Sequence, residues 1–297
     1  MKGEGVASVE QGDVNYGTKP DPKAETSTNT EKTAVIEYKE ASSDDTAYSQ
    51  TVPTAVGNYT VRATFAETEA YGEAVATTDF SIRYLETPEP PYTLVGTKGE
   101  NGYYTSNVVV KPAKGYMIST ELNGTYVESL TIQNSQSGTV FYLRNASGER
   151  TGALRLETIK IKKQTPKLSL ENGKTYYGDS QKLVIQDDYL SQVYVNGVLQ
   201  NLDGTEFVLQ LGSNNGKKKY EITAVDVAGN KKTILVTVAA AWMKTGIIPE
   251  GVLVNLETGN GYKLGNGNWK VAGDSTSYSG GTEFYVKKDG SYTFGKQ

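Results

Sequence analysis

The sequence predicts an all-β protein that consists of consecutive β-sandwich domains followed by a small C-terminal β module. The clearest evidence is the stretch 220–238, YEITAVDVAGNKKTILVTV, in which apolar and polar residues alternate on both sides of a turn at 228–230. The composition agrees, because 32 glycines and 21 tyrosines beside only three methionines indicate turns and strands rather than helices. In addition, one order of strand and turn signals occurs twice along the chain.

Composition also bounds the size and the partners of these domains. A chain of 297 residues is long enough for roughly two to four domains. Only 37% of the residues are hydrophobic, so each core must be small. The net charge of −4 predicts no nucleic-acid partner, and the longest like-charged run, Lys217–Lys219, is expected to be a solvated turn.

The absence of two residue types excludes several kinds of site. Without cysteine the chain forms neither a disulfide nor a thiolate metal site. Without histidine it contains no Ser-His-Asp or Cys-His arrangement and no histidine-ligated metal. No apolar run is long enough to predict membrane insertion, and the N-terminal MKGEGVASVE lacks the apolar region of a signal peptide. If the natural protein is secreted, we expect this chain to be a mature fragment without its targeting segments.

The first predicted domain covers residues 1–86. Alternation at 59–65 and a return strand at 78–82 predict a hairpin like that at 220–238, with a longer loop. Residues 86–91, ETPEPP, form a linker, because proline donates no ladder hydrogen bond and favours extended backbone.

The second and third predicted domains, residues 87–164 and 165–239, contain the same signals in the same order. A Tyr-Tyr pair, an apolar triplet, an Asn-Gly dipeptide and a closing strand pair recur after about 75 residues, the size of one sandwich domain. The Asn-Gly dipeptides at 123–124 and 196–197 each predict a hairpin turn with positive φ at both residues. In the second domain, the closing strand pair is expected at 139–144 and 153–161.

The last predicted domain, residues 240–297, is a small turn-rich β module. Residues 242–250 are expected to form an irregular bridge or a short helical turn. Hairpin turns are predicted at three glycine-containing dipeptides, namely Asn260-Gly261, Asn266-Gly267 and Asp289-Gly290. Because a module of about 50 residues is marginal alone, we expect it to pack against the third domain, with Trp242 as the candidate contact.

Three stretches resemble known bacterial repeats. In the first domain, YGTKPDPKAETSTNT, VPTAVGNYTVRATF and DFSI resemble MBG-type and related bacterial immunoglobulin-like repeats. In the third, Asp226, Ala228, Gly229 and Asn230 resemble the DxAGN ending of bacterial immunoglobulin-like domains. GNGYKLGNGNWKVAGDSTSYSGGTEFYV is similar to units that end such arrays in surface proteins of gut Firmicutes. The resemblance implies tandem immunoglobulin-like β-sandwiches on the exterior of a Gram-positive bacterium, and this fold serves spacers, adhesive modules and accessory modules alike.

The adjacent carboxylates Asp44-Asp45 and Asp187-Asp188 are the obvious candidates for acid–base chemistry. Neighbouring strand residues point to opposite faces, so neither pair could flank one glycosidic bond as a glycosidase requires. We therefore expect solvated turn carboxylates, no catalytic residue and no enzyme.

Calcium is the one metal that the composition allows, because oxygen ligands are abundant. The candidate ligands are Asp187, Asp188, Asp226 and Asn230. No Asp-x-Asp-x-Asp-Gly spacing occurs, and Asp226 and Asn230 are explained as turn residues that bond their own backbone. We predict no metal site and no cofactor, while a structural calcium and an internal Lys–Asn isopeptide bond stay open as alternatives.

Aromatic residues of the C-terminal module are candidates for glycan binding, because sugars stack on exposed ring faces. Trp269 lies between glycine turns, with Tyr262, Tyr278, Tyr285 and Tyr292 nearby in sequence. In so small a module, however, large aromatic side chains are needed to fill the core. The core interpretation is therefore favoured for Trp269.

These observations predict a non-enzymatic extracellular stalk or adhesion segment of a bacterial surface or secreted protein. Stiff tandem modules with short proline-containing linkers would present or space a binding region. The expected partner is a host or cell-wall glycan or protein. The alternative function is a carbohydrate-binding or accessory segment of a larger secreted glycan-degrading enzyme.

Overall fold

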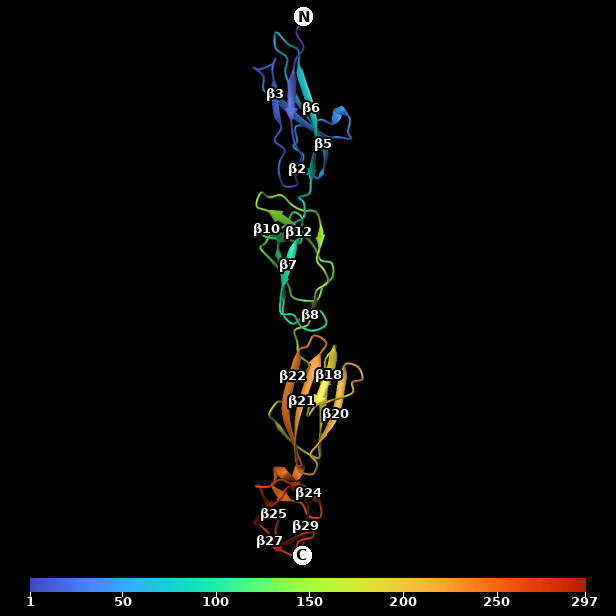
Figure 1. The fold of residues 1–297 in the computed structure, drawn as a ribbon, viewed down its shortest axis with the longest axis vertical. Helices are drawn as coiled ribbons and strands as arrows, with labels where there is room; N and C mark the ends of the chain where they lie inside the picture. Colours follow the sequence, from blue (N-terminus) through green and yellow to red (C-terminus); the bar gives the residue numbers. More distant parts are fainter. The chain divides into compact units, whose positions relative to one another are not determined.

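The computed structural model describes residues 1–297 and confirms the all-β prediction (Figure 1). The helical elements are two short 3-10 turns, η1 (Asp45–Ala47) and η2 (Ala241–Lys244). The chain divides into two compact units, residues 1–97 with 106–161 and residues 98–105 with 162–297. The four predicted domains remain our proposal for the domain borders, and we name the first, second and third segments and the C-terminal module after them.

The first segment belongs to the first unit and contains a four-stranded sheet in the order β2-β6-β5-β4 beside the pair β1-β3. Its strands are β1 (Ala7–Glu10), β2 (Val14–Asn15), β3 (Lys23–Thr26), β4 (Val35–Glu40), β5 (Gly57–Phe65) and β6 (Ala74–Arg83). The predicted hairpin is confirmed, since β5 and β6 pair antiparallel with Tyr59 opposite Phe80. Tyr59, Val61, Ala63 and Phe65 all point into the core, as their alternation predicts.

The second segment has two three-stranded sheets, β11-β9-β7 and β10-β12-β13. Its strands in the first unit are β7 (Tyr92–Val95), β9 (Val108–Pro112), β10 (Tyr116–Ser119), β11 (Leu130–Ile132), β12 (Val140–Asn145), β13 (Leu154–Arg155) and β14 (Lys160–Ile161). Val108, Ile118, Phe141 and Leu143 are fully buried in its core.

Two predictions for the second segment need correction. The predicted hairpin turn at Asn123-Gly124 is wrong, because neither residue has positive φ and the flanking strands β10 and β11 lie in different sheets. Instead, the Gly124 amide donates to the Glu121 carbonyl in a turn within a loop. The predicted closing pair is only partly formed, since β12 pairs with β13 over two residues and β14 does not belong to this sheet.

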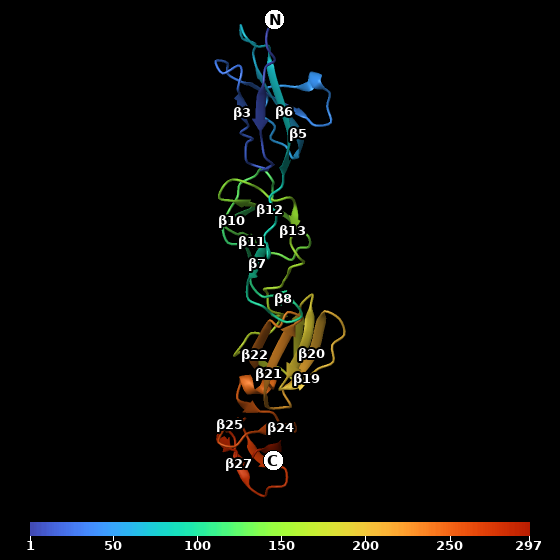
Figure 2. The ribbon, with the colours of Figure 1, turned by 45° about the horizontal axis from the view of Figure 1, so that its top comes forward.

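The third segment, in the second unit, has a three-stranded sheet, β15-β17-β20, and a five-stranded sheet, β16-β22-β21-β18-β19 (Figure 2). Its strands are β15 (Lys167–Leu168), β16 (Thr175–Tyr177), β17 (Ser180–Gln186), β18 (Leu190–Val195), β19 (Val198–Leu199), β20 (Glu206–Gly212), β21 (Lys217–Asp226) and β22 (Lys231–Ala239). The first, third and sixth strands of the segment form one sheet and the other five strands form the second, as in an immunoglobulin-like sandwich.

Both turn predictions in the third segment are confirmed. β21 and β22 pair antiparallel with Tyr220 opposite Val236 and Ile222 opposite Ile234, all buried in one core. Asn196 and Gly197 have φ of 52° and 78°, and they connect the paired strands β18 and β19.

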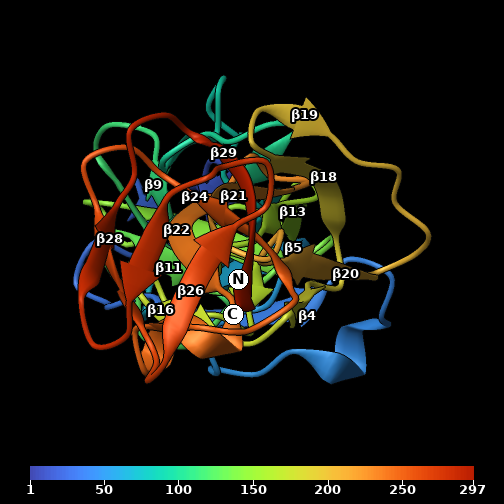
Figure 3. The same cartoon turned by 90° about the horizontal axis from the view of Figure 1, so that it is seen from below.

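The C-terminal module consists of the sheets β23-β25-β28 and β24-β29-β26-β27. Its strands are β23 (Ile247–Ile248), β24 (Leu253–Leu256), β25 (Gly261–Leu264), β26 (Asn268–Val271), β27 (Ser277–Ser279), β28 (Glu283–Tyr285) and β29 (Gly290–Lys296). The core between the sheets contains Trp269, Phe284 and Phe294. In Figure 3 the module is drawn in orange and red, with β28 at its edge and apart from β26, which belongs to the other sheet.

The three hairpin turns predicted in this module are wrong. The dipeptides at 260–261, 266–267 and 289–290 stand between β24 and β25, β25 and β26, and β28 and β29. In each case the two flanking strands belong to different sheets. The glycine signals therefore mark points where the chain crosses between sheets, as a small sandwich requires.

Candidate functional site

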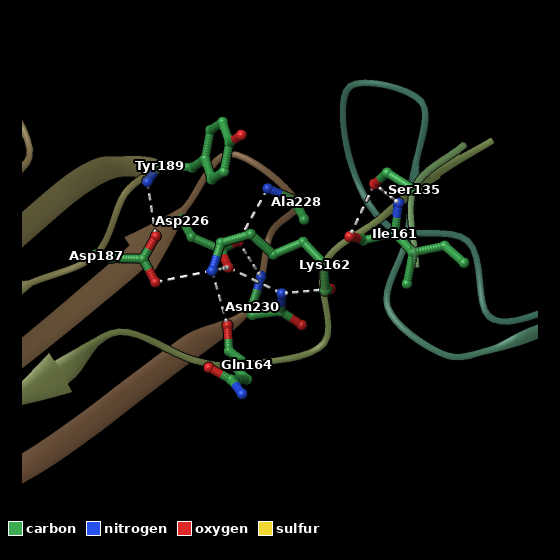
Figure 4. Close-up of polar contacts among 9 residues, drawn as sticks. All are labelled: Ser135, Ile161, Lys162, Gln164, Asp187, Tyr189, Asp226, Ala228 and Asn230. Atoms are coloured by element: carbon green, nitrogen blue, oxygen red, sulfur yellow. Dashed lines mark hydrogen bonds and ion pairs between the residues drawn. The ribbon is translucent and has the colours of Figure 1, made fainter. Parts of the chain in front are cut away.

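Lys162 is the centre of a buried charged cluster in the second unit (Figure 4). Its side chain is only 13% exposed, and its Nζ lies 2.8 Å from Asp187 Oδ2 and 3.3 Å from Asp226 Oδ2. The same ammonium donates to the Gln164 carbonyl oxygen at 3.2 Å. Lys162 precedes the third segment by three residues and lies in the same unit, and it is bonded to the ends of two strands of that segment.

The local fold explains why both carboxylates face Lys162. Asp187 follows β17, and its Oδ1 accepts a hydrogen bond from the Tyr189 amide at 2.8 Å. Asp226 ends β21, and its Oδ1 accepts from the amides of Ala228 and Asn230, each at 2.9 Å. Each aspartate therefore stabilises its own turn with Oδ1 and leaves Oδ2 for the lysine.

Asn230 completes the cluster from the other side of the turn. Its Nδ2 donates to Asp226 Oδ2 and to the Lys162 carbonyl oxygen, both at 2.9 Å. The interpretation as a turn residue that bonds its own backbone is confirmed for Asp226. Asn230 lies in the same turn, but its side chain bonds Asp226 and Lys162 instead of its own backbone. The contact with Lys162 was not predicted, because Lys162 is 64 positions before Asp226 in a lysine-rich stretch with no distinguishing pattern.

Electrostatics keep Lys162 protonated. Burial by itself would lower the pKa of Lys162, but the hydrogen bonds and negative charges of Asp187 and Asp226 outweigh it and raise the pKa above its ordinary value. A protonated amine is a counter-ion rather than a nucleophile. The arrangement can therefore hold the chain in place, and it offers no acid–base or nucleophilic chemistry.

The predicted carboxylate pairs have different environments. Asp44 caps η1 by accepting from the Thr46 amide at 2.9 Å, and exposed Asp45 pairs with Lys39 at 2.9 Å. The prediction of solvated turn carboxylates fits this pair and exposed Asp188. The prediction is wrong for Asp187, whose side chain is only 6% exposed. Lys162, which is 25 residues away in sequence, contacts this carboxylate and shields it from solvent.

The candidate calcium ligands do not form one oxygen cage. Asp187 and Asp226 direct their free oxygens at Lys162, while Asp188 is exposed and makes no contact with the cluster. A calcium ion at this point would have to displace the lysine ammonium. Elsewhere in residues 1–297, no three carboxylates gather in a way that suits a metal.

The turn at 226–230 also binds the loop 98–105, which includes β8 (Tyr103–Tyr104). The Glu100 amide donates to the Ala228 carbonyl at 2.9 Å, and Asn101 Nδ2 donates to the Val227 carbonyl at 2.8 Å. A Cβ at Gly99 would overlap with the Ala228 carbonyl oxygen, so glycine is required for this approach. The DxAGN turn is therefore a joint between this loop and the third segment.

A second joint lies within the first unit, between the first and second segments. The Arg150 amide donates to the Tyr16 carbonyl at 2.9 Å, and the Leu85 amide donates to the Arg150 carbonyl at 2.8 Å. Gly17 has φ of 108°, and a Cβ there would overlap with the Gly148 carbonyl oxygen. The backbones of the two segments thus touch directly.

Side chains reinforce this second joint. Tyr16 OH donates to Asn123 Oδ1 at 2.9 Å, which gives the residue of the wrongly predicted hairpin another role. Glu149 accepts hydrogen bonds from Asn145 Nδ2 at 2.6 Å and Asn15 Nδ2 at 3.1 Å. These bonds, led by that from Asn145, lower the pKa of Glu149 below its ordinary value.

The third joint connects the third segment with the C-terminal module. The Ala240 amide donates to the Gly216 carbonyl at 2.7 Å, and the Asn255 amide donates to the Asn215 carbonyl at 3.1 Å. A Cβ at Gly216 would overlap with the Asn255 carbonyl oxygen. Trp242 packs its ring 5.8 Å from Tyr262, against the core of the module itself.

The aromatic residues considered for glycan binding are mostly internal. Trp269 is 2% exposed and its Nε1 donates to the Gly265 carbonyl at 2.7 Å, while Tyr262 is 8% exposed. Tyr278 is half-buried and packs 5.3 Å from Phe284. The core interpretation of Trp269 agrees with its burial, and neither Trp269 nor Tyr262 presents a ring face to a sugar.

Comparisons with known proteins add little to this geometry. No known family model matches the chain, and no curated protein is similar to it. Among solved structures, the chain is similar to three N-terminal domains of the bacteriophage RB49 outer capsid protein Hoc, with 11% identity, TM-score 0.30 and coverage of 80% of this chain and 99% of that one. It is also similar to the sialic acid binding region of a Streptococcus sanguinis adhesin, with 12% identity, TM-score 0.24 and coverage of 83% and 80%.

A third similar structure is a Bacteroides ovatus glucan-utilisation protein, SGBP-B, with 10% identity, TM-score 0.19 and coverage of 100% of this chain and 90% of that one. These likenesses are too remote to assign a function. No helix of the structure has the length and apolar character needed to cross a membrane.

Proposed function

We propose that this chain is a non-enzymatic spacing or adhesion segment of a surface or secreted protein. In this function, consecutive domains hold a binding region in a defined position relative to its neighbours. The proposal extends to an extracellular location and to a bacterial, Gram-positive source, which the sequence resemblance supports.

The observation that supports the proposal is the construction of the joints. Each of the three joints contains main-chain hydrogen bonds between segments, and each contains a glycine whose Cβ would overlap with a neighbouring carbonyl. Flexible linkers form no such contacts and leave their domains free to reorient. Joints of this kind suit a segment that must keep its domains aligned.

The available chemistry agrees with a non-enzymatic function. The chain has no histidine and no cysteine, and its buried carboxylates Asp187 and Asp226 are occupied by turn amides and Lys162. Nothing in this cluster is arranged to move a proton or attack a substrate.

The test is the width of a distance distribution across the joint in the first unit. The chain has no cysteine, so cysteines introduced at Glu25 on β3 and Lys111 on β9, both exposed, can be spin-labelled selectively. Electron–electron resonance should give a single narrow distance in the full chain. A distribution as broad as that of two domains on a flexible linker would contradict the proposal.

Glycan binding is the second candidate function, either for adhesion or as an accessory segment of a glycan-degrading enzyme. Among the aromatic residues of the C-terminal module, Trp269 and Tyr262 are buried, but Tyr285 is 64% exposed. The exposed ring of Tyr285 favours glycan binding by the C-terminal module.

A further inference from the structure

The outer face of the sheet β23-β25-β28 presents an unusual tyrosine. Tyr285 is the most exposed of the tyrosines on the surface of the protein, at 64%, compared with 51% for Tyr177 and 53% for Tyr189. Its neighbours along the chain, Phe284 and Val286, point inward and are buried. Tyr285 therefore contributes almost nothing to the core, although its ring is large enough to do so.

The ring nevertheless has a defined position. Tyr285 stands opposite Gly261 in the pairing of β28 with β25, and the place of a Cβ on Gly261 is 3.0 Å from Tyr285 Cε1. Its hydroxyl donates to Glu283 Oε2 at 2.6 Å, two residues earlier on the same strand. Because the ring touches the glycine and its hydroxyl points back along β28, the ring lies along the sheet rather than projecting from it.

The ring approaches Gly261 at Cε1, and Tyr285 is 64% exposed, so the ring is held close to the strand and still offers a free face to solvent. The hydrogen bond to Glu283 restricts rotation of the ring, so little conformational entropy would be lost when a ligand stacks on it. Gly261 makes the arrangement possible, because any side chain there would lift the ring from the strand.

Polar side chains lie on the same side of the sheet as Tyr285. Lys263 and Glu283 are opposite each other in the pairing of β25 with β28, and both are exposed. Ile247, which is 47% exposed, pairs with Lys263 on the far side. One flat face thus combines an aromatic surface with an ammonium donor and a carboxylate acceptor.

We propose that this face, defined by Tyr285, Glu283, Lys263 and Gly261, binds a neutral glycan. The π face of tyrosine carries partial negative charge and attracts the polarised C–H groups on one side of a pyranose ring. Lys263 and the carboxylate of Glu283 can then bond the ring's equatorial hydroxyls. An equatorially linked chain of pyranoses presents C–H groups on its ring faces and hydroxyls at its edges, which matches a tyrosine ring beside a lysine and a glutamate.

This inference rests on the second candidate function, glycan binding, and names its site, and it does not depend on the joints that carry the spacing function. A purely structural explanation also exists, since an aromatic side chain that covers a strand glycine can stabilise the sheet. The two explanations differ in what the free face of the ring does, and ligand binding separates them.

The experiment titrates the full chain with cellohexaose, xylohexaose, chitohexaose and mannohexaose while amide spectra are recorded. We expect at least one of them to shift resonances of β25 and β28. Tyr285→Ala should weaken that binding about tenfold or more. Tyr177→Ala, which removes an exposed tyrosine from β16 in the same unit, should leave the binding unchanged.

Two further measurements keep the test decisive. Lys263→Ala should weaken binding while the thermal unfolding midpoint stays near that of the unaltered chain, because its side chain is exposed. Absence of shifts with all four hexasaccharides would overturn the proposal. Binding that survives Tyr285→Ala in a folded protein would overturn it as well.

Discussion

The joint in the first unit holds the first and second segments together, and the joint around Lys162 in the second unit holds the loop 98–105 and Lys162 to the third segment, each with different groups. The first depends on backbone contact, with Gly17 against Gly148 and main-chain hydrogen bonds at Arg150. The second adds buried charge, with Lys162 between Asp187 and Asp226. A Cβ added at Gly17 should disrupt the joint in the first unit, whereas loss of the Lys162 charge should disrupt the joint in the second unit. The following predictions use this difference.

The largest effect is expected for Lys162→Met. Removing one partner of a buried ion pair leaves uncompensated charge and typically costs about 3–5 kcal/mol, and here two carboxylates lose their counter-ion. Hydrogen exchange in the full chain should show faster exchange of the amides of β21 and β22. Lys167→Met, at an exposed position of the same segment, should change their exchange little.

The double variant Lys162→Met/Asp187→Asn sharpens this prediction. Because the two residues are in contact, the combined loss of stability should be smaller than the sum of the single losses. Additive losses would show that the ion pair does not couple them.

A smaller effect is expected for Gly17→Ala. Positive φ alone costs a residue with a Cβ about 1–2 kcal/mol, and at Gly17 the new Cβ would also overlap with the Gly148 carbonyl. Gly115→Ala is the matched control, because Gly115 has φ of 87° and open space around it. Only Gly17→Ala should broaden the spin-label distance distribution across the joint. Equal broadening in both variants would show that the contact with Gly148 is unimportant.

Alkaline pH should weaken the charged joint. The pKa of Lys162 is raised above 10.5 in the folded protein, so the stabilisation is complete below 10.5 and is lost as the pH rises through the folded value. Exchange of the Glu100 amide, which is bonded to the same turn, should reveal this loss after correction for intrinsic exchange rates. In Lys162→Met, the exchange of the Glu100 amide should not show this additional increase at alkaline pH.

Acid should weaken the joint in the first unit by a small amount. The pKa of Glu149 is lowered below 4.5, so its contribution is present above 4.5 and is lost as the pH falls through the folded value. The spin-label distribution should broaden slightly in acid. Glu149→Gln should remove this pH dependence while it keeps an oxygen that can accept from Asn145.

The smallest expected change concerns the covalent mass. A protonated Lys162 does not attack Asp187 or Asn230, so the intact protein should have the mass of its sequence. A deficit of one water or one ammonia that maps to Lys162 would contradict the interpretation of the cluster as an ion pair.

The comparison of the two joints also shows what the sequence could predict. Strands 59–65 and 220–238 were predictable, because their alternation persists over many residues and determines which face is buried. Asn196-Gly197 formed its predicted turn because alternating strands flank it. Asn123-Gly124 did not, since its neighbours enter different sheets and Asn123 is bonded to Tyr16 instead.

The site was less predictable than the fold. Asp226 was correctly explained by local turn geometry, which a short stretch of sequence encodes. The contacts of Asp226 and Asn230 with Lys162 depend on where the chain enters the third segment, and no local pattern encodes that. Alternation along β28 puts Tyr285 outside and Phe284 inside. This assignment requires the boundaries of β28, which a short run between glycines does not define.

The most direct test of the account is hydrogen exchange at the joint amides of the unaltered full chain. The relevant amides are those of Leu85, Arg150, Glu100, Ala240 and Asn255, each bonded to a carbonyl of another segment. If the joints fix the segments, these amides should exchange orders of magnitude more slowly than unstructured amides, as the neighbouring strand amides do. Exchange at the rate of a free linker would contradict the central claim that the joints within each unit hold their segments together.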